Sequence, residues 1–228
     1  MNEDKIVSHS KNTLLQRLFF CCPSLFIKSD TKPVLSGEYD LGPAISSNDN
    51  QSCFKKTLIL DLDETLIYSS FKPFSVKGSD LTVKYQVPNK KYIFSSYIIK
   101  RPGLDDFLNY VKEKFEVVIF TASMKEYADA AIDAIAPWIP SSHRFYRNHC
   151  KHLKGVYIKD LSKFNRPIES IILIDDSFVA LSLNRSNVIT IPAWFGEAND
   201  RELSKLQNLI LPQLEKADDV RNVIRKLV

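Results

Sequence analysis

The chain has 228 residues, of which 44% are hydrophobic, and its 31 basic and 27 acidic residues give a formal net charge of +4. This length and composition are sufficient for one domain with a sizeable buried core. The net charge is small and is not concentrated in a basic stripe, so direct binding to nucleic acid is not expected.

Cysteine spacing and hydropathy indicate a soluble intracellular protein. The four cysteines form no C-x-x-C pair and no spacing typical of a disulfide framework, which favours reduced thiols. No apolar run reaches the roughly 18–20 residues that a membrane-spanning helix needs. The N-terminus is polar and of mixed charge, unlike a secretory signal.

Residues 1–54 differ in composition from the rest of the chain. They are rich in Ser, Asn, Asp and Lys and show no sustained periodicity, so we expect a flexible N-terminal tail. Within this tail, residues 14–26 (LLQRLFFCCPSLF) are apolar. Two interpretations remain open for that segment: a short helix docked on the domain, or an interfacial segment that associates with a membrane through S-acylation of Cys21 and Cys22.

From Thr57 onward, short apolar runs alternate with amphipathic segments, which is the pattern of an α/β fold. Residues 57–63 (TLILDLD) begin as an apolar run and predict a buried strand. Residues 81–87 and 92–100 predict a β-hairpin around the sequence PNKK, with period-2 alternation in its first strand. Residues 103–114 predict a helix with one apolar face and two acids in its first turn.

The second half of the chain continues this alternation. Residues 116–123 (EVVIFTAS) predict a second buried strand, and a helix over residues 125–136 is expected to stop at Pro137. Further elements are expected in two regions: strands at 170–177 and 188–195, and two helices from Asp200 onward with a break near Pro212. Strands that alternate with helices favour a central parallel sheet.

Polar side chains lie at the ends of three of these strands. They form three pairs: Asp61 and Asp63, Thr121 and Ser123, and Asp175 and Asp176. Ligands bind beyond the carboxyl ends of the strands in open parallel sheets, so one site built from several strands is expected. Clustered carboxylates repel one another and raise each other's pKa unless a cation is present. Oxygen ligands without His or Cys suit Mg²⁺.

Other phosphate chemistries lack their motifs in this sequence. Gly37 and Gly42 have the spacing of a P-loop, but Pro43 follows instead of lysine. There is no G-x-G-x-x-G loop and no G-x-S-x-G nucleophile elbow. No cysteine is followed six residues later by the arginine that a cysteine phosphatase requires. The aspartate cluster is therefore the candidate site.

The sequence DLDET, residues 61–65, resembles the D-x-D-x-T signature of the haloacid dehalogenase superfamily of aspartate-nucleophile phosphotransferases. The chain resembles most its small C-terminal-domain phosphatase branch (FCP/SCP-like, NLI-interacting-factor-like), which dephosphorylates the tail of RNA polymerase II. Five ordered blocks carry this resemblance: DLDETLIYSSFKP, KRPGLDDFL, FTASMKEYAD, YIKDLSKF and DDVRNVIRK. It implies a phosphatase domain over 55–228, with a Rossmann-like fold, helices on both faces, a small β-hairpin insertion and no large cap domain.

The resemblance implies roles for the residues of DLDET. Asp61 would be the nucleophile and would form an aspartyl-phosphate. Asp63 would protonate the departing oxygen and later accept a proton from the attacking water. Glu64 is expected to be a structural or capping residue, and Thr65 is expected to steady the turn.

Residues on the later strands would complete the site. Thr121 and Lys159 would hold the phosphoryl oxygens. The implied Mg²⁺ ligands are Asp61, the main-chain carbonyl of Asp63, and Asp176, with Asp175 bracing the site. The branch commonly has Asp-Asn where this chain has Asp175-Asp176. This departure puts the identity of the substrate in doubt more than the activity.

An open site is expected, because each of the two positions for a cap holds fewer than forty residues. Such a site favours a phosphorylated protein segment over a small metabolite. The resemblance implies substrate contacts from Phe71, Met124 and Tyr127, which would form an apolar pocket for proline, from Tyr85 or Val87 less securely, and from Arg147. The alternatives are ordinary core packing for the aromatic residues and a surface ion pair for Arg147.

The sequence therefore favours a Mg²⁺-dependent phosphoserine/phosphothreonine protein phosphatase. Its expected substrate is the polymerase tail or a similar proline-directed site, and nuclear localisation is favoured. One alternative is a membrane-associated phosphatase of signalling or lipid-metabolism proteins. Another is a catalytically silent module that binds phosphopeptides, although the presence of both Asp61 and Asp63 speaks against it. The oligomeric state stays open.

Overall fold

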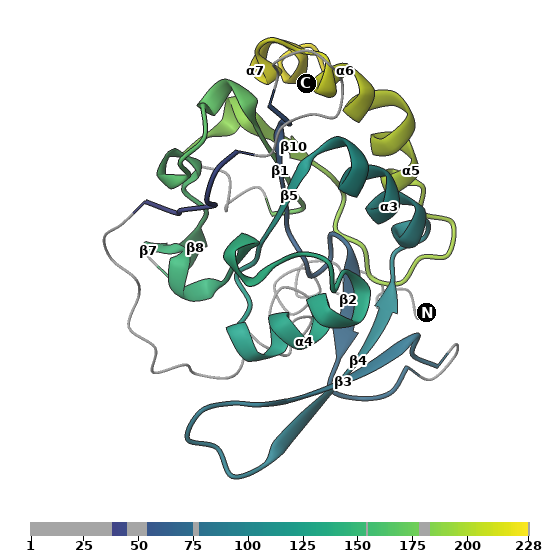
Figure 1. Ribbon diagram of the computed structural model, residues 1–228. Coiled ribbons are helices and arrows are strands. Elements are labelled where there is room, and N and C mark those ends of the chain that lie inside the picture. Colours follow the sequence, from purple (N-terminus) through teal and green to yellow (C-terminus); the bar gives the residue numbers. More distant parts are fainter. Residues whose placement is uncertain (1–37, 45–53, 75–77, 154, 178–182, 228) are drawn as a thin grey trace, which may run out of the picture.

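A computed structural model of the chain describes residues 38–44, 54–74, 78–153, 155–177 and 183–227 (Figure 1). Its centre is a five-stranded sheet in the order β10-β9-β1-β5-β6, in which every neighbouring pair is parallel. The strands are β1 (Thr57–Leu60), β5 (Glu116–Phe120), β6 (Arg144–Phe145), β9 (Ile171–Asp175) and β10 (Val188–Thr190). The predicted central parallel sheet is thereby confirmed, and the short edge strand β6 is added to it.

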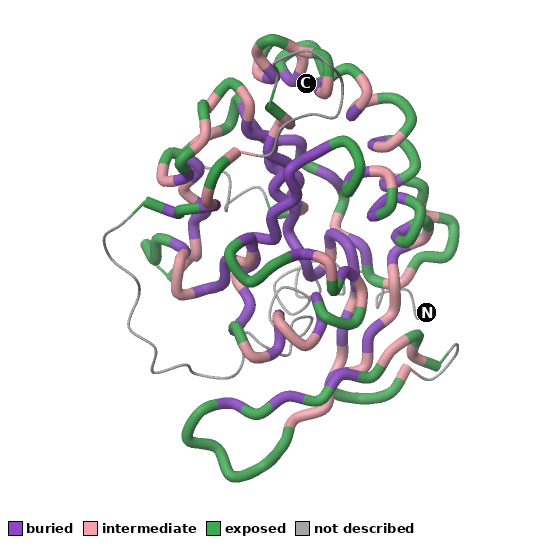
Figure 2. The backbone as a smooth tube through the Cα atoms, viewed as in Figure 1, coloured by how far each residue is buried: buried purple, intermediate pink, exposed green. Residues whose placement is uncertain are grey.

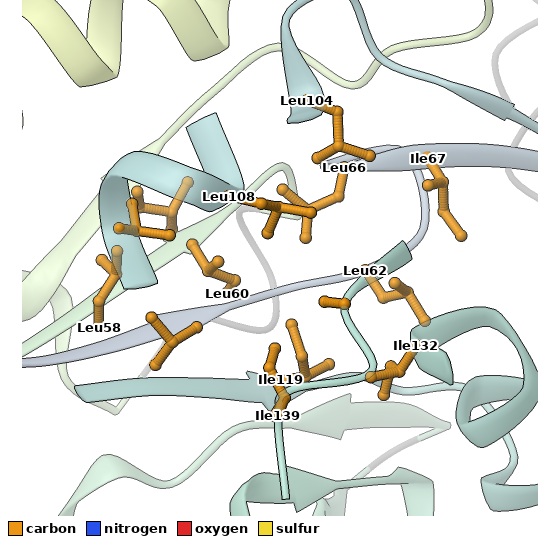
Figure 3. Packing of buried hydrophobic residues seen from close by; sticks show 14 of the residues in the cluster. Leu58, Leu60, Leu62, Leu66, Ile67, Leu104, Leu108, Ile119, Ile132 and Ile139 are labelled. Atoms are coloured by element: carbon orange, nitrogen blue, oxygen red, sulfur yellow. The ribbon is translucent and has the colours of Figure 1, made fainter. Parts of the chain in front are cut away.

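The sheet is the most deeply buried part of the molecule (Figure 2). Strands β1, β5 and β9 are buried along their whole length. Side chains of β1 alternate between two hydrophobic clusters, with Leu58 and Leu60 in the larger one and Ile59 in the smaller one. Figure 3 shows Leu58 and Leu60 along β1 on the side of Leu108. Burying each such side chain stabilises the fold by about 1.5–3 kcal/mol.

Five α-helices contribute to the larger cluster. They are α3 (Leu104–Lys114), α4 (Lys125–Ile135), α5 (Glu202–Lys205), α6 (Leu211–Glu215) and α7 (Val220–Ile224). The smaller cluster contains no buried α-helical side chain among the described residues, and 3₁₀ turns and segment 38–44 supply its outer layer. In the described part of the chain, α-helices cover the face of the central sheet that carries the larger cluster, and 3₁₀ turns lie on the face that carries the smaller one.

The 3₁₀ turns are short and connect the larger elements. They lie at Ser141–His143, Arg147–His149, Leu161–Lys163, Ile168–Ser170 and Arg185–Asn187.

Helix α3 buries residues at the predicted helical spacing, namely Leu104, Phe107, Leu108 and Val111. It begins after Gly103, whose φ of 80° lies in the left-handed region that glycine adopts without strain.

A small antiparallel sheet is inserted between β1 and α3 and lies at the bottom of Figure 1. It contains β2 (Ile67–Ser70), β4 (Ile93–Lys100) and β3 (Leu81–Gln86), in that order. The predicted β3–β4 hairpin is confirmed, whereas β2 was not predicted. A second, smaller hairpin, β7 (Lys151–Leu153) with β8 (Val156–Ile158), lies between Thr121 and Lys159. The described residues at both insertion points form no large cap.

The prediction of a helix break near Pro212 is wrong. The chain stays helical from α5 through a π-helical turn (Leu206–Ile210) into α6, where Pro212 lies in the first turn. Proline fits within this continuous helical run because a π turn with an i→i−5 hydrogen bond directly precedes it and interrupts the regular i→i−4 pattern. The helix instead ends before Asp219, whose carboxylate accepts the N–H of Arg221 and caps α7.

Segment 38–44, which the sequence assigned to the tail, lies against the domain. Tyr39 and Leu41 are buried, and Tyr39 forms an isolated parallel bridge with Phe164. The predicted apolar segment 14–26, with Cys21 and Cys22, lies outside the described residues. Among the residues that are described, no helix has the length and hydrophobicity needed to cross a bilayer.

Candidate active site

Three neighbouring strands bring polar residues to the same end of the sheet, where the carboxyl ends of the parallel strands lie. Asp61 follows β1, Thr121 follows β5, and Asp175 ends β9. The register pairs Leu60 of β1 with the penultimate residues of both β5 and β9, so these strand ends lie level. The N–H of Asp61 donates to the carbonyl of Ile174 at 3.0 Å, which fixes the start of the loop that follows β1.

Lys159, which follows β8, lies between two of these carboxylates. Its Nζ is 2.5 Å from Asp61 Oδ1 and 2.6 Å from Asp175 Oδ2, and its side chain is 2% exposed. Burial lowers the pKa of Lys159, but the charges of Asp175 and Asp61 outweigh burial, so its pKa is raised and the ammonium stays charged. The structure thus places a fixed cation beside the predicted nucleophile.

Asp61, Asp175 and Asp176 could together hold a metal ion. Each offers one carboxylate oxygen, and the three oxygens lie within 4.8 Å of one another. Asp175 already accepts the lysine ammonium and the N–H of Ser177, whereas Asp176 accepts the hydroxyl of Thr65 at 3.1 Å. An all-oxygen set fits Mg²⁺. Asp61 accepts the same lysine ammonium as Asp175, so these contacts do not distinguish which of the three carboxylates would be ligands.

The pKa values of this carboxylate trio show why a cation suits the site. Burial is the main cause that raises the pKa of Asp61 to about 6, with Lys159 opposing it and Asp176 adding to it. Burial, and then the charge of Asp175, raises the pKa of Asp176 to about 6 as well. A divalent cation would offset both the burial and the repulsion and would favour the ionised carboxylates.

The carboxylate of Asp63 is held by side-chain hydroxyls from three different elements. Its Oδ1 accepts the hydroxyl of Tyr127 at 2.6 Å and that of Ser69 at 3.3 Å. Its Oδ2 accepts the hydroxyl of Ser123 at 2.6 Å. Tyr127 comes from α4, Ser69 from β2 and Ser123 from the turn after β5. Asp63 is 6% exposed, so its orientation depends on these partners.

Two further predicted residues lie at the turn after β5: Thr121 belongs to it, and Arg147 contacts it from the 3₁₀ turn that follows β6. The N–H of Ser123 donates to Thr121 Oγ1 at 3.0 Å, so the threonine hydroxyl keeps its own hydrogen to donate. Arg147 is fastened to the same turn, because its Nε donates to the carbonyl of Ala122 at 2.7 Å. Its guanidinium also lies 5.2 Å from the ring centroid of Tyr157.

Glu64 has an unusual backbone and a partly buried side chain. Its φ of 58° is left-handed, its N–H donates to the carbonyl of Ile67, and its carbonyl accepts the N–H of Trp194. Its Oε1 has no hydrogen-bond partner among the described residues. Burial, followed by the charges of Asp63 and Asp176, raises the pKa of Glu64 to about 10. These contacts fit the structural role expected for Glu64.

Arg101 ties the DLDET turn to the loop that follows β10. Its Nη1 donates to the carbonyl of Thr65 at 3.1 Å, and its Nη2 donates to that of Pro192 at 3.0 Å. The guanidinium also makes a two-point pair with Asp200, with both distances at 2.8 Å. Thr65 therefore supports the site through its carbonyl as well as through its hydroxyl bond to Asp176.

The predicted apolar substrate residues differ in exposure. Phe71 is 41% exposed, whereas Tyr127 is fully buried, and Met124, Tyr85 and Val87 are buried too. Of these five, Phe71 is the one that presents apolar surface in this structure. The ring of Phe71 lies 6.5 Å from that of Phe94 in β4. Next to Phe94 in the sequence, Tyr92 just before β4 and Ile93 at its start are also exposed.

The sequence analysis gave no role to three residues that contact the site: Ser69, Ser123 and Arg101. The sequence analysis named Ser123 with Thr121 among the polar strand ends expected at the site, but gave its hydroxyl no partner. Ser69 carried none, because strand β2 was not predicted. Arg101 follows a strand and looks like an ordinary surface arginine in sequence, yet it is 1% exposed.

Comparison with known proteins gives a consistent family. The family described as NLI interacting factor-like phosphatase matches residues 56–221. A probable C-terminal domain small phosphatase of Dictyostelium discoideum is 43% identical over 169 residues, covering 74% of this chain and 54% of that protein. The phosphatase Herzog of Drosophila melanogaster is 35% identical, covering 75% of this chain and 47% of that protein. The chain thus spans about half the length of these relatives.

A human relative is matched over more of its length, and solved structures share the fold. The human carboxy-terminal domain RNA polymerase II polypeptide A small phosphatase 1 is 33% identical, covering 83% of this chain and 69% of that protein. The structure of the fission yeast RNA polymerase II CTD phosphatase Fcp1 bound to beryllium fluoride superposes with a TM-score of 0.52 at 22% identity. It covers 75% of this chain and 54% of that one, which shows the shared fold.

Proposed function

Because the chain belongs to the family of NLI interacting factor-like phosphatases, we propose that it is a Mg²⁺-dependent protein serine/threonine phosphatase with an aspartyl-phosphate intermediate. The observation that carries this proposal is the buried arrangement of Lys159 between Asp61 and Asp175. This arrangement supports Asp61 as the nucleophile, because its carboxylate lies next to a fixed cation at the carboxyl ends of the strands, where Asp63 and Thr121 also lie.

The first half-reaction transfers the phosphoryl group to Asp61. A carboxylate oxygen of Asp61 forms a bond to phosphorus while the bond from phosphorus to the serine or threonine oxygen breaks. Asp63, in its protonated form, gives its proton to the departing oxygen, which leaves as an alcohol. Lys159 and the hydroxyl of Thr121 bind the phosphoryl oxygens and stabilise the charge that they carry in the transition state.

The second half-reaction returns the enzyme to its starting state. A water molecule attacks phosphorus, and Asp63, now ionised, accepts the proton that the water releases. The bond between phosphorus and Asp61 breaks, which frees the carboxylate and inorganic phosphate. Bound Mg²⁺, held by Asp61 and Asp176 with the main-chain carbonyl of Asp63, would supply positive charge that neutralises the phosphoryl group.

The proposed substrate is a phosphoserine or phosphothreonine beside proline in an extended protein segment, such as the tail of RNA polymerase II. Relatives are named for that substrate, and the described insertions leave the site without a large cap. Exposed Phe71 would contact the proline, and Arg147 would lie beside the phosphorylated segment. Action on the polymerase tail would place the protein in the nucleus. Action on signalling or lipid-metabolism proteins at a membrane is the alternative substrate assignment.

Hydrolysis of p-nitrophenyl phosphate tests this proposal. The wild type should turn over with Mg²⁺ and lose turnover after chelation, and both Asp61→Asn and Asp63→Asn should remove most of it. Each variant should unfold cooperatively on heating, with a midpoint close to that of the wild type, which shows that the loss of turnover is not due to unfolding. A folded wild type that binds Mg²⁺ without turnover would contradict the phosphatase assignment and favour a silent phosphopeptide-binding module.

A separate measurement tests the nucleophile without turnover. Beryllium fluoride is bound by a variant of the structural relative Fcp1. If Asp61 is the nucleophile, beryllium fluoride should bond to its carboxylate in place of a phosphoryl group. We expect a ¹⁹F NMR signal of bound fluoride with the wild type and Mg²⁺, and no such signal with Asp61→Asn. A signal that persists in Asp61→Asn would assign the nucleophile to another residue.

A further inference from the structure

The three hydroxyls around Asp63 form a defined structure that the mechanism above does not require. Ser123 lies in the turn just before α4, and Tyr127 lies in the first turn of that helix. Both hydroxyls are 2.6 Å from the Asp63 carboxylate, one on each oxygen. Ser69 reaches Oδ1 from the inserted sheet at 3.3 Å. Donors from three elements thus fix the plane of one carboxyl group.

We propose that Ser69, Ser123 and Tyr127 form a hydroxyl cradle that positions the Asp63 carboxyl for proton transfer to the leaving oxygen, with Tyr127 as its main positioning residue. This inference rests on the proposed phosphatase function and adds a role for residues outside DLDET. The proton that moves is that of Asp63. The three hydroxyls keep their own hydrogens and orient the carboxyl by donating hydrogen bonds to it.

Tyr127 is the most constrained member of the cradle. It is fully buried, and its ring packs edge-on against Tyr85 of β3 with the centroids 5.6 Å apart. The hydroxyl of Tyr85 lies 3.2 Å from Ser96 Oγ of β4. The inserted sheet therefore supports the ring from behind, and the ring presents its hydroxyl to Asp63. A rigid donor of this kind restricts the side-chain rotation of its acceptor.

Burial assigns Tyr127 to this role rather than to direct substrate contact. A side chain with no exposed surface cannot form the wall of a proline pocket in this conformation. The same hydroxyl bonds could simply satisfy a buried carboxylate without helping catalysis. The two explanations differ in one measurable respect, because only positioning for proton transfer depends on the basicity of the leaving group.

The test compares two small substrates of similar size, p-nitrophenyl phosphate and phenyl phosphate. p-Nitrophenolate leaves readily without a proton, whereas phenolate is more basic and depends more on the acid. kcat/KM reports the steps up to phosphorylation of Asp61, so hydrolysis of the shared intermediate does not affect the comparison. We expect Tyr127→Phe to lower kcat/KM about tenfold for phenyl phosphate and about twofold or less for p-nitrophenyl phosphate.

Three further variants separate positioning from general damage. Ser123→Ala should show the same selective loss as Tyr127→Phe, and it keeps the inference testable if Tyr127→Phe folds poorly. In an Asp63→Asn background, Tyr127→Phe should cause no further selective loss, because the acid is already absent. The control is Tyr146→Phe, which removes a tyrosine hydroxyl bond to Asp129 on the same helix and should leave both substrates unaffected.

Equal losses on both substrates, or no loss on either, would overturn the cradle while leaving the phosphatase function in place. An additional selective loss in the Asp63→Asn background would overturn it too, because Tyr127 would then act independently of Asp63. A wild type that hydrolyses neither substrate would instead overturn the proposed function, and the cradle with it. A phosphoserine peptide, whose leaving oxygen is still more basic, should show at least the loss seen with phenyl phosphate.

Discussion

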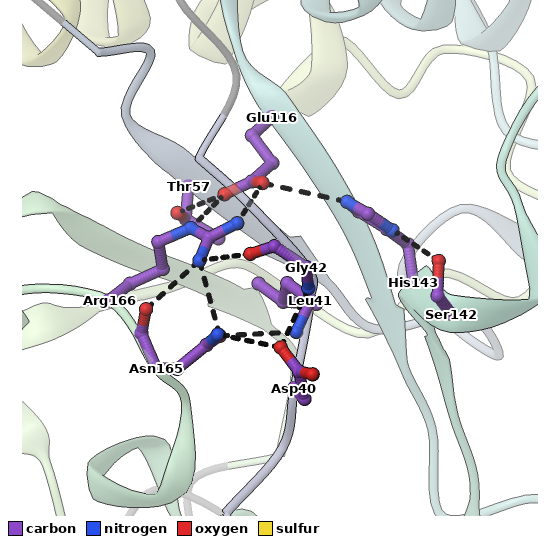
Figure 4. Close-up of polar contacts among 9 residues, drawn as sticks. All are labelled: Asp40, Leu41, Gly42, Thr57, Glu116, Ser142, His143, Asn165 and Arg166. Atoms are coloured by element: carbon purple, nitrogen blue, oxygen red, sulfur yellow. Dashed lines mark hydrogen bonds and ion pairs between the residues drawn. The ribbon is translucent and has the colours of Figure 1, made fainter.

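Glu116, at the start of β5, is the centre of a buried polar cluster (Figure 4). The cluster lies at the amino ends of the parallel strands, whereas Asp61 lies beyond their carboxyl ends. It accepts the hydroxyl of Thr57 at 2.8 Å and a two-point pair from Arg166 at 2.6 and 2.8 Å. The Nε2 of His143 lies 3.6 Å from it. Burial would raise the pKa of Glu116, but its contacts with His143, Arg166 and Thr57 outweigh burial and lower it to about 2.

This lowered pKa predicts how stability depends on pH. Unfolded glutamate has a pKa of about 4.3, so between that value and about 2 the unfolded chain binds more protons than the folded one. The contribution of Glu116 to stability is therefore complete above about pH 4.3 and is lost as the pH falls toward 2. Glu116→Gln should lower the free energy of unfolding at pH 7 by about 2 kcal/mol.

Urea unfolding at pH values from 3 to 7 would test the prediction for Glu116. The stability difference between wild type and Glu116→Gln should be largest and constant above about pH 5, and should shrink toward pH 3. Glu197→Gln, at an exposed residue away from the cluster, is the control and should show little difference. A difference for Glu116→Gln that does not change with pH would contradict the assignment of the charged pair.

At the level of single elements, the sequence predicted those whose apolar pattern is complete. Strand β1 and helix α3 were predicted because their apolar residues recur with a clear strand or helix pattern. Strand β2 was missed because its sequence, IYSS, is half serine and shows no apolar run. The helix break was wrongly predicted near Pro212 because proline was treated as a helix breaker, although the π turn directly before it lets the helical run continue to Glu215.

Arg101 shows how one residue can hold several elements together. Its guanidinium bonds to the turn at Thr65, to the loop at Pro192 and to Asp200, which precedes α5. The planar group reaches these acceptors in different directions, which the single ammonium of lysine cannot reproduce. We expect Arg101→Lys to lower the free energy of unfolding by about 2–4 kcal/mol, even though the charge is kept.

Urea unfolding would measure this change, with activity on p-nitrophenyl phosphate as a second readout. Lys100→Ala is a matched control at the neighbouring position, because its pair with Asp105 is on the surface and such pairs contribute about 0–1 kcal/mol. Arg101→Lys should also reduce turnover, since Thr65 belongs to the turn that carries Asp63. Equal stability of Arg101→Lys and wild type would show that the ionic charge, and not the geometry, is what matters.

At the scale of the whole molecule, the sequence predicted the part of the candidate site whose residues lie at the carboxyl ends of buried strands. Asp61, Thr121 and Asp175 meet because the strands are parallel, and that follows from the strand pattern and the rule for parallel sheets. The contacts of Asp63 with Ser69 and Tyr127 could not be predicted in the same way. They depend on how the inserted sheet and α4 lie against the central sheet, which no local pattern encodes.

Segment 38–44 extends the folded unit beyond the boundary that the sequence gave at residue 55. Tyr39 is buried among the rings of Phe120, Phe145 and Phe164, with centroids 5.0–5.9 Å from its own. Its N–H donates to the carbonyl of Lys163 at 2.6 Å, and its hydroxyl donates to the carbonyl of His149. The segment therefore covers the face of the sheet opposite the α-helices of the larger cluster.

We therefore expect a variant that begins at residue 38 to be more stable than one that begins at residue 55. Loss of the buried side chains of Tyr39 and Leu41 alone should cost about 3–6 kcal/mol, and domains of this kind have about 5–15 kcal/mol in total. Urea midpoints would measure the difference, and the double substitution Tyr39→Ala with Leu41→Ala in the full chain should reproduce most of it. Equal midpoints for the two truncated variants would place the N-terminal boundary of the domain at residue 55 after all.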